Sequence, residues 1–207
     1  MTRMTTPKEL FVHELQDVYY AEKQFTTVLP KLASEASDGE LTRAFQSHLK
    51  ETQRQIVNLE KVFKNIGEQA QGKQCPGIDG IKEEHEEFMR EHSTTPVLTD
   101  VFLTGSAARA EHYEIAAYTS LIEQARALGE RDSVKLLQAN LKQEKDAAKK
   151  VETISKRILK KATPSARSRS NGAPKRRSTS ASSTRSRSSS SARSTSGTRR
   201  TASRSRS

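Results

Sequence analysis

Hydrophobic residues recur every three or four positions in four long stretches of this chain, over about residues 7–36, 39–65, 96–128 and 132–162. This spacing places them on one face of an α-helix, so each stretch predicts an amphipathic helix. At roughly 1.5 Å per residue, each helix is about 40–48 Å long. Helices of this length with one apolar face are typical of a helical bundle, and the sequence therefore predicts an all-α domain.

Local signals mark where these helices begin and end. Thr6 and Glu9 form a capping box with Pro7 in the first turn, and Ser37–Glu40 has both a turn sequence and the pattern of a second capping box. Gly67 and Gly129 follow the second and third helices, where glycine commonly ends a helix. The helix boundaries are therefore well marked.

The connections between the helices predict the topology. Short turns join the first helix to the second and the third to the fourth, so each pair is antiparallel. The middle connection, residues 67–96, is much longer and contains a short amphipathic segment from Ile78 to His92. One long crossover between two helical hairpins, here with a short extra helix, is the arrangement of a ferritin-like four-helix bundle.

A polar group interrupts each of the four apolar faces. The interruptions are Glu22 in the first stretch, His48 and Gln55 with Glu51 on the flank in the second, Glu111 in the third and Glu144 in the fourth. An isolated carboxylate in a bundle core costs several kcal/mol, so such groups are paired, protonated or bound to a cation. Their repetition in four helices indicates a shared site.

The positions of these acids along the helices agree with one another. Glu22 lies about fifteen residues before the first turn and Glu51 about fourteen after it, while Glu114 and Glu144 flank the second turn by about sixteen and fourteen residues. In antiparallel hairpins these pairs reach matching levels near the middle of the bundle. Glu111 lies one helical turn from Glu114, so either or both could face the axis.

Carboxylates at one level of a bundle predict a di-iron or di-manganese centre, since oxygen and imidazole ligands suit these metals. The expected ligands are Glu22, His48, Glu51, Glu111, Glu114 and Glu144, surrounded by Gln55, His112 and Tyr118. The usual Glu-x-x-His pairs are absent, because Arg54 and Ala147 stand where the histidines would be. An alternative remains open, in which the acids form salt bridges and His48 is a hydrogen-bonded core residue without metal.

Four segments of the sequence resemble the YciE/YciF-type family of ferritin-like bacterial proteins. They are Tyr19–Gln24, His48–Thr52, Glu111–Ala116 and Glu144–Lys145, and the resemblance covers about residues 7–162. It implies a dimeric, rubrerythrin-related bundle linked to stress responses. Whether such a protein is an enzyme, for example a metal-dependent peroxidase, catalase or ferroxidase, stays open.

The composition changes sharply after Thr163. Residues 1–163 contain 24 basic and all 25 acidic residues, so the whole net charge of +11 belongs to residues 164–207. Twelve basic residues are spread along this Ser/Arg-rich segment: Arg167, Arg169, Lys175, Arg176, Arg177, Arg185, Arg187, Arg193, Arg199, Arg200, Arg204 and Arg206. A segment without large apolar residues cannot offset its ordering entropy, so we expect a disordered tail beside a bundle of residues 1–163.

The charge of the tail predicts sequence-independent binding to nucleic acid, since it offers many phosphate contacts and no aromatic ring to stack on bases. A solubilising role, attachment to an anionic membrane and an Arg-Ser segment switched by phosphorylation are the alternatives. The N-terminus lacks a secretory signal, no stretch is apolar enough to span a membrane, and Cys75 has no partner for a disulfide. These features favour the cytoplasm, with nucleoid association if the tail binds DNA.

Together these features predict a cytoplasmic, homodimeric stress protein that handles iron or peroxide at a metal centre and binds nucleic acid through its tail. The alternative is a non-enzymatic dimeric scaffold, or a nucleoid-associated protein, that lacks a metal centre.

Overall fold

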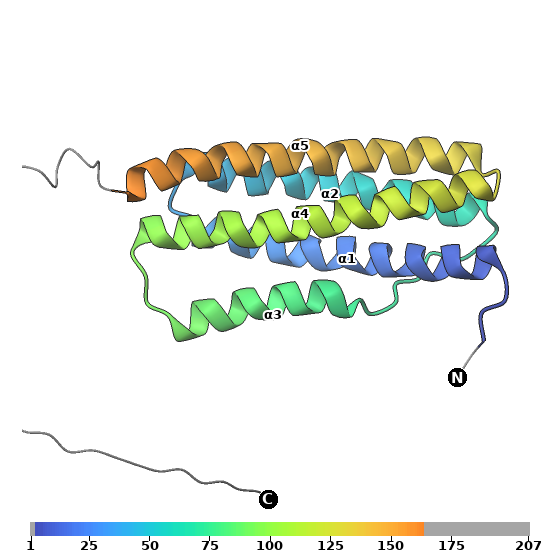
Figure 1. Cartoon of the computed structure of the whole chain (residues 1–207), viewed down its shortest axis with the longest axis horizontal. Coiled ribbons are helices and arrows are strands. Elements are labelled where there is room, and N and C mark those ends of the chain that lie inside the picture. The colour runs from blue at the N-terminus through green and yellow to red at the C-terminus, as the bar shows by residue number, and fades with distance from the viewer. Residues whose placement is uncertain (1–2, 164–207) are drawn as a thin grey trace, which may run out of the picture. The chain divides into compact units, whose positions relative to one another are not determined.

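The computed structural model describes residues 3–163, which form five α-helices and no strand. The helices are α1 (Pro7–Glu35), α2 (Gly39–Asn65), α3 (Pro76–Glu91), α4 (Pro96–Ala127) and α5 (Arg131–Ala162), as Figure 1 shows. Met1, Thr2 and the basic segment 164–207 lie outside the described residues. No helix in residues 3–163 is apolar over a length that would span a bilayer.

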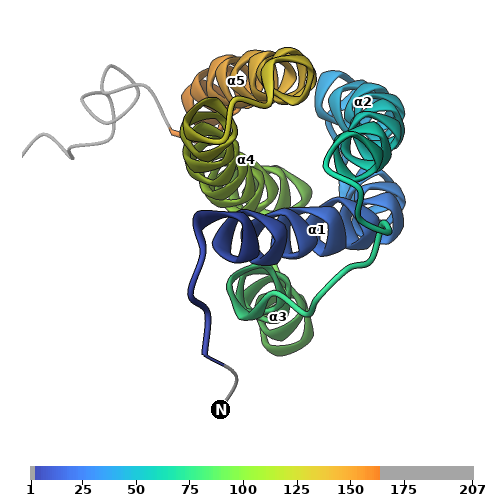
Figure 2. The same ribbon diagram turned by 90° about the vertical axis from the view of Figure 1, so that its right-hand side faces the viewer.

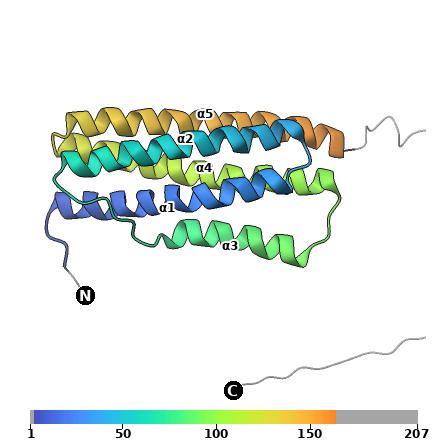
Figure 3. The ribbon, with the colours of Figure 1, turned by 180° about the vertical axis from the view of Figure 1, so that it is seen from behind.

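Four of the helices form an antiparallel bundle, and the fifth lies outside it. Seen end-on, α1, α2, α5 and α4 surround a common axis, while α3 lies beyond α1 and α4 (Figure 2). The view from behind shows the same order, with α3 inside the connection from α2 to α4 (Figure 3). The ferritin-like bundle with one long crossover and a short extra helix is therefore confirmed.

The helix ends follow the sequence signals with one correction. The Thr6–Glu9 capping box is present at α1, and Gly67 and Gly129 adopt positive φ angles of 75° and 79° after α2 and α4. At α2, however, the cap is Asp38, whose carboxylate accepts hydrogen bonds from the first helical turn. Ser37 instead donates its backbone N–H to Asp100 of α4, 2.8 Å away, which anchors the turn to the bundle.

Asp38 also ties the start of α2 to the end of α5. Two guanidinium nitrogens of Arg157 donate to its two carboxylate oxygens, at 2.8 and 2.5 Å. The hydrogen bonds from Arg157 hold the pKa of Asp38 below its usual range, although partial burial opposes this. A paired, geometrically matched contact of this kind fixes the relative height of the two helices.

Two apolar layers fill the core and enclose a polar layer between them. One contains Phe25, Leu41, Phe45, Leu103 and Ile154, and the other contains Phe11, Leu15, Leu59, Phe63, Leu121 and Leu137. Glu22, His48, Gln55, Glu111, Glu114, Tyr118, Asn140 and Glu144 are buried between these layers along the helices. The acids thus lie at a common level near mid-bundle, as their spacing predicted.

The buried face of α4 differs in part from the stripe that helical spacing predicts, namely Val101, Ala108, Glu111, Ile115, Tyr118 and Ile122. Val101, Ala108 and Ile115 are only half-buried, and Leu103, Ala107, Ala110, Glu114, Leu121 and Ala125 are buried instead. The reason is that α4 packs against α1, α3 and α5 together, so its buried surface covers more than one face. A stripe of one apolar residue per turn does not describe a helix with three neighbours.

Candidate metal centre

Four side chains from three helices converge in the polar layer. His48 projects from α2, Glu111 and Glu114 from α4 and Glu144 from α5, and one potential ligand atom from each lies within 4.8 Å of the others. All four residues are buried. On α4 the two acids are three residues apart, which places both on the same face of the helix.

His48 is the centre of this cluster. Its Nε2 atom lies 3.4 Å from Glu111 Oε1 and 3.7 Å from Glu144 Oε2. Its Nδ1 atom lies 3.4 Å from Glu51 Oε2, one helical turn along α2. With Nδ1 protonated and donating to Glu51, the lone pair on Nε2 faces the carboxylates, which is the orientation of a metal-binding imidazole.

Hydrogen bonds from neutral groups orient the carboxylates of α1 and α5. The hydroxyl of Tyr118 donates to Glu22 Oε1, and the amide of Gln55 donates to Glu144 Oε1. Asn140 in turn donates to the Tyr118 oxygen at 3.1 Å and to the backbone carbonyl of Gln55 at 3.3 Å. These bonds hold the acids in position without neutralising them.

Several buried oxygens in the cluster have no hydrogen-bond donor among the described residues. They are Glu111 Oε2, Glu114 Oε1, Glu144 Oε2 and, beside them, Gln55 Oε1. Buried polar atoms are nearly always hydrogen-bonded, and a group without protein donors is suited to bind an ion or water. His48 together with three carboxylates presents nitrogen and oxygen ligands of the kind that bind iron and manganese, so this cluster could hold a metal.

The electrostatics of the layer are dominated by burial. Desolvation raises the pKa values of Glu22, Glu111 and Glu114 well above their usual range, and the neighbouring Glu144 carboxylate adds to each shift. Burial also opposes charge on His48, but Glu111, Glu51 and the other acids outweigh it and raise its pKa to about 9. The layer therefore attracts positive charge strongly.

Known proteins share this architecture and sequence. Residues 6–163 match the family described as "Domain of unknown function (DUF892)". The chain belongs to this family. Protein YciF of Escherichia coli K12 is 38% identical over 143 residues, which are 69% of this chain and 86% of YciF.

Solved structures of the family agree with the fold. The crystal structure of the E. coli stress protein YciF matches with a TM-score of 0.73 and 35% identity, covering 76% of this chain and 99% of that chain. YcfI of Rhodopseudomonas palustris, for which a structural role is proposed, matches with a TM-score of 0.72 and 41% identity, covering 74% and 98%. The similarity is thus to the bundle and leaves out the basic segment.

Of the predicted ligands, Glu22 is buried in the same layer beside Tyr118 but is not one of the four clustered residues. Glu51 and His112 lie farther from the centre. Glu51 is at its edge, where its side chain is 30% exposed and contacts His48 rather than the other acids. His112 is exposed, and its Nδ1 atom lies 2.8 Å from the carbonyl of Ala108 on its own helix. Adjacent helical residues point about 100° apart, so Glu111 and His112 face different directions. The predicted nucleic-acid-binding residues, Arg167 to Arg206, lie outside the described residues.

Asn140 is a part of the site that the sequence analysis missed. It is fully buried and links Tyr118, Gln55 and Asn58, which donates to its side-chain oxygen at 2.8 Å. The sequence does indicate this residue, because Asn140 is three residues after Leu137 and four before Glu144. This spacing places it on the buried face of α5. An amide at such a position predicts a buried polar network.

Proposed function

We propose that the bundle binds a di-iron or di-manganese centre and that the protein acts on iron or peroxide in a stress response. The observation that carries this proposal is the convergence of unpartnered carboxylate oxygens and His48 Nε2 in one buried layer. The description of the relative YciF as a stress protein supports the physiological setting.

The number of acids in the layer favours the binding of two divalent cations. Glu22, Glu111, Glu114 and Glu144 are four buried acids, and two divalent ions would neutralise four carboxylates. Without cations, the layer retains protons on acids whose pKa values are raised, and His48 carries a compensating positive charge. Cations would replace these protons and supply the unpartnered oxygens with ligand bonds.

Each side chain has a role that follows from its contacts. Glu111, Glu114, Glu144 and His48 would hold the metal, with Glu22 completing the set from α1. Glu51 fixes the ring of His48, while Tyr118 and Gln55 orient Glu22 and Glu144. A bound iron or manganese pair would supply electron exchange with peroxide or dioxygen. The apolar layers on both sides limit access of water to that chemistry.

The remaining parts of the proposal concern partners. Twelve positive charges in residues 164–207 would bind nucleic acid through phosphate contacts, placing a cytoplasmic protein on the nucleoid. A homodimer follows from the family resemblance.

A second candidate function is a scaffold without metal. The structural role proposed for the relative YcfI favours it, as does the ability of His48 to act as a cation beside Glu111 and Glu51. In that case the layer is a buried salt-bridge network, and binding by the tail and the dimer surface carries the function.

Metal analysis of the whole chain tests the proposal against the scaffold. The protein is purified without chelator or metal-affinity resin, equilibrated with Fe²⁺ without oxygen or with Mn²⁺, desalted, and analysed by elemental mass spectrometry. We expect about two ions per chain, the number that a bundle di-metal centre binds. The Glu114→Gln/Glu144→Gln variant should bind none, whereas Glu60→Gln, a change on the outer face of α2, should bind as wild type.

Unfolding experiments separate loss of metal from loss of fold. Mn²⁺ should raise the unfolding temperature of the wild type and leave that of the double variant unchanged. A wild-type protein that stays folded but takes up neither metal would contradict the metal centre and favour the scaffold.

A further inference from the structure

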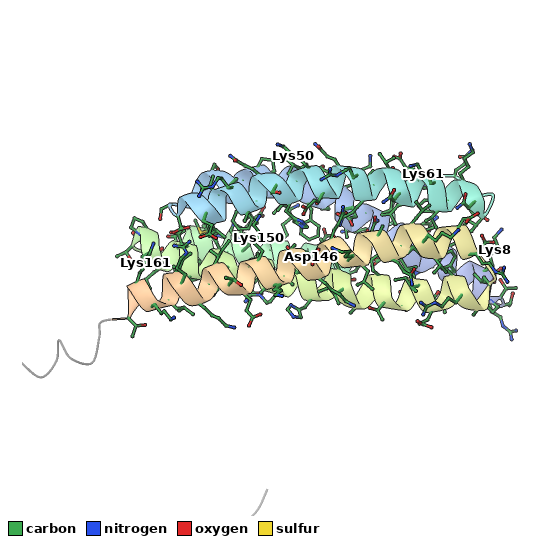
Figure 4. All side chains as sticks on the ribbon, turned by 90° about the horizontal axis from the view of Figure 1, so that it is seen from above. Lys8, Lys50, Lys61, Asp146, Lys150 and Lys161 are labelled. Atoms are coloured by element: carbon green, nitrogen blue, oxygen red, sulfur yellow. The ribbon has the colours of Figure 1, made fainter. Side chains whose placement is uncertain are left out.

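A cavity connects the candidate metal centre to the surface between α2 and α5. It has a volume of about 80 Å³, and its inner wall is formed by His48 and Glu111, two of the potential ligands. Its outer part is lined by Glu51 of α2 and by Asp146 and Lys150 of α5. Figure 4 shows Asp146 and Lys150 along α5, beside α2.

Small side chains keep this opening free. Ala44 on α2 and Ala147 on α5 line it, where larger apolar residues would close the space between the helices. Phe45 and Val151 complete the apolar part of its lining. Ala147 lies three residues after Glu144, so the small residue stands one turn from a ligand.

The size of the cavity restricts what passes through it. About 30 Å³ is the share of one water molecule in the liquid, so the cavity holds only a few waters. A fully hydrated divalent cation is larger than this and must exchange part of its water shell for protein ligands on the way in. The mouth offers two carboxylates, of which Asp146 is paired with Lys142. The other, Glu51, has a side chain that is 30% exposed, compared with 6% for Glu111 and 0% for Glu144.

The contacts of Glu51 distinguish it from the resident ligands. Its carboxylate contacts His48 Nδ1, whereas Glu111 and Glu144 lie near Nε2 on the other side of the ring. It is therefore in contact with both solvent and the ring, whose Nε2 atom faces the cluster. Two lysines make the mouth less favourable for a cation. Lys150 lines the mouth and repels positive charge, and Lys142 forms a salt bridge with Asp146 at 2.5 Å.

We propose that the opening between α2 and α5 is the path by which divalent cations reach the buried centre, and that Glu51 is a transfer ligand. Glu51 binds the incoming ion at the mouth, replaces part of its water shell and passes it to Glu111 beside His48. Lys150 slows this step by repelling the ion. The inference rests on the proposed metal centre and specifies how that centre is loaded.

The rate of cation uptake tests this role, because it separates transfer from final binding. Co²⁺ is mixed with the metal-free whole chain in a stopped-flow instrument, and quenching of the fluorescence of tyrosines such as Tyr118 reports its arrival. Glu51→Gln retains an oxygen that accepts the hydrogen bond from His48 but removes the charge. We expect uptake about tenfold slower with an unchanged final stoichiometry, and faster uptake in Lys150→Gln.

A steric variant tests the path independently of charge. Ala147→Leu narrows the opening and should also slow uptake, while Glu123→Gln removes a surface carboxylate of α4 and should leave the rate unchanged. Wild-type rates in both Glu51→Gln and Ala147→Leu would overturn the inference. Loss of bound metal at equilibrium in Glu51→Gln would also overturn it, because Glu51 would then be a resident ligand. Absence of Co²⁺, Fe²⁺ and Mn²⁺ binding in the wild type would instead overturn the metal centre itself.

Discussion

At the scale of single residues, the polar layer is a set of acids held by neutral donors. Tyr118 and Gln55 each donate to one carboxylate, and Asn140 donates to the Tyr118 hydroxyl and to the backbone carbonyl of Gln55. Neutral donors stabilise the position of an acid without removing its charge, whereas lysine or arginine would neutralise it. Within the described residues, no lysine or arginine forms a salt bridge with the buried acids of the layer, so a cation would not have to displace a basic side chain.

Removing one neutral donor should destabilise the layer. Tyr118→Phe leaves Glu22 without its donor and Asn140 without one acceptor, and we expect a loss of about 1–3 kcal/mol in the free energy of unfolding. Chemical denaturation of the metal-free protein measures it. Tyr19→Phe is the matched control, because the Tyr19 hydroxyl donates to Glu60 at the bundle surface, and it should cost less. Equal effects of the two changes would contradict the network.

The raised pKa values predict an unusual dependence of stability on pH. Glu22, Glu111 and Glu114 hold protons in the folded state above pH 4.5, where the unfolded chain has released them. His48 does the same between its usual pKa of 6.5 and its folded value of about 9. A folded state that binds more protons loses stability as pH rises, by about 1.4 kcal/mol per pH unit for each retained proton.

Denaturation in chelator at pH 5, 7 and 8.5 should therefore show decreasing stability of the metal-free protein. Asp38 acts in the opposite sense, since its lowered pKa gives stability that is lost only below about pH 4. Glu22→Gln/Glu114→Gln should flatten the decrease above pH 5. Stability that rises steadily from pH 5 to 8.5 in the wild type would show that the buried acids do not retain their protons.

At the scale of helices, the sequence predicted the features that depend on local residues, such as helix ends. It did not predict the features that depend on packing between helices. The ends of α1 and α2, the extra helix α3 and the common level of the acids all followed from caps, glycines and spacing. The buried face of α4 did not, because its contacts with α1, α3 and α5 arise only in the folded bundle. The spacing did place Glu51 on the flank of the apolar face of α2, where it lies. Whether a flanking acid reaches the centre depends on the rotation of α2, which spacing alone does not determine.

The attachment of α3 to the bundle depends on a close contact at its first turn. A Cβ atom at Gly77 would lie 2.6 Å from the ring of Tyr113, whose hydroxyl is 3.0 Å from Cys75 Sγ and donates to Asp17 at 3.1 Å. Gly77→Ala should therefore displace the ring, cost about 1–3 kcal/mol and expose Cys75. Thermal unfolding and the rate of thiol labelling measure both effects.

Gly80→Ala provides the control on the same helix. Nothing lies within 4 Å of a Cβ at this position, so alanine should stabilise α3 by up to about 1 kcal/mol through its higher helix propensity. Labelling of Cys75 should stay slow. A destabilising effect of the same size at both glycines would show that the contact with Tyr113 is not what holds α3.

At the scale of the whole molecule, charge is divided between two regions with different chemistry. The bundle is almost neutral, whereas residues 164–207 carry twelve positive charges and no acid. A neutral bundle has little attraction for phosphates, so any strong binding to nucleic acid must come from the basic segment. The proposed metal centre and the proposed binding to nucleic acid therefore use different residues.

Removing residues 164–207 tests this division. Because the capped helices, both core layers and the Asp38–Arg157 pair all lie within residues 3–163, we expect the shortened protein to unfold at the same temperature as the whole chain. Its affinity for duplex DNA in mobility-shift assays should fall by orders of magnitude. Binding by the whole chain should weaken steeply between 50 and 200 mM salt, as counterion release requires when several phosphates are contacted. Equal DNA binding by both forms would move the nucleic-acid surface to the bundle, where the lysines of α5 would be the residues to change next.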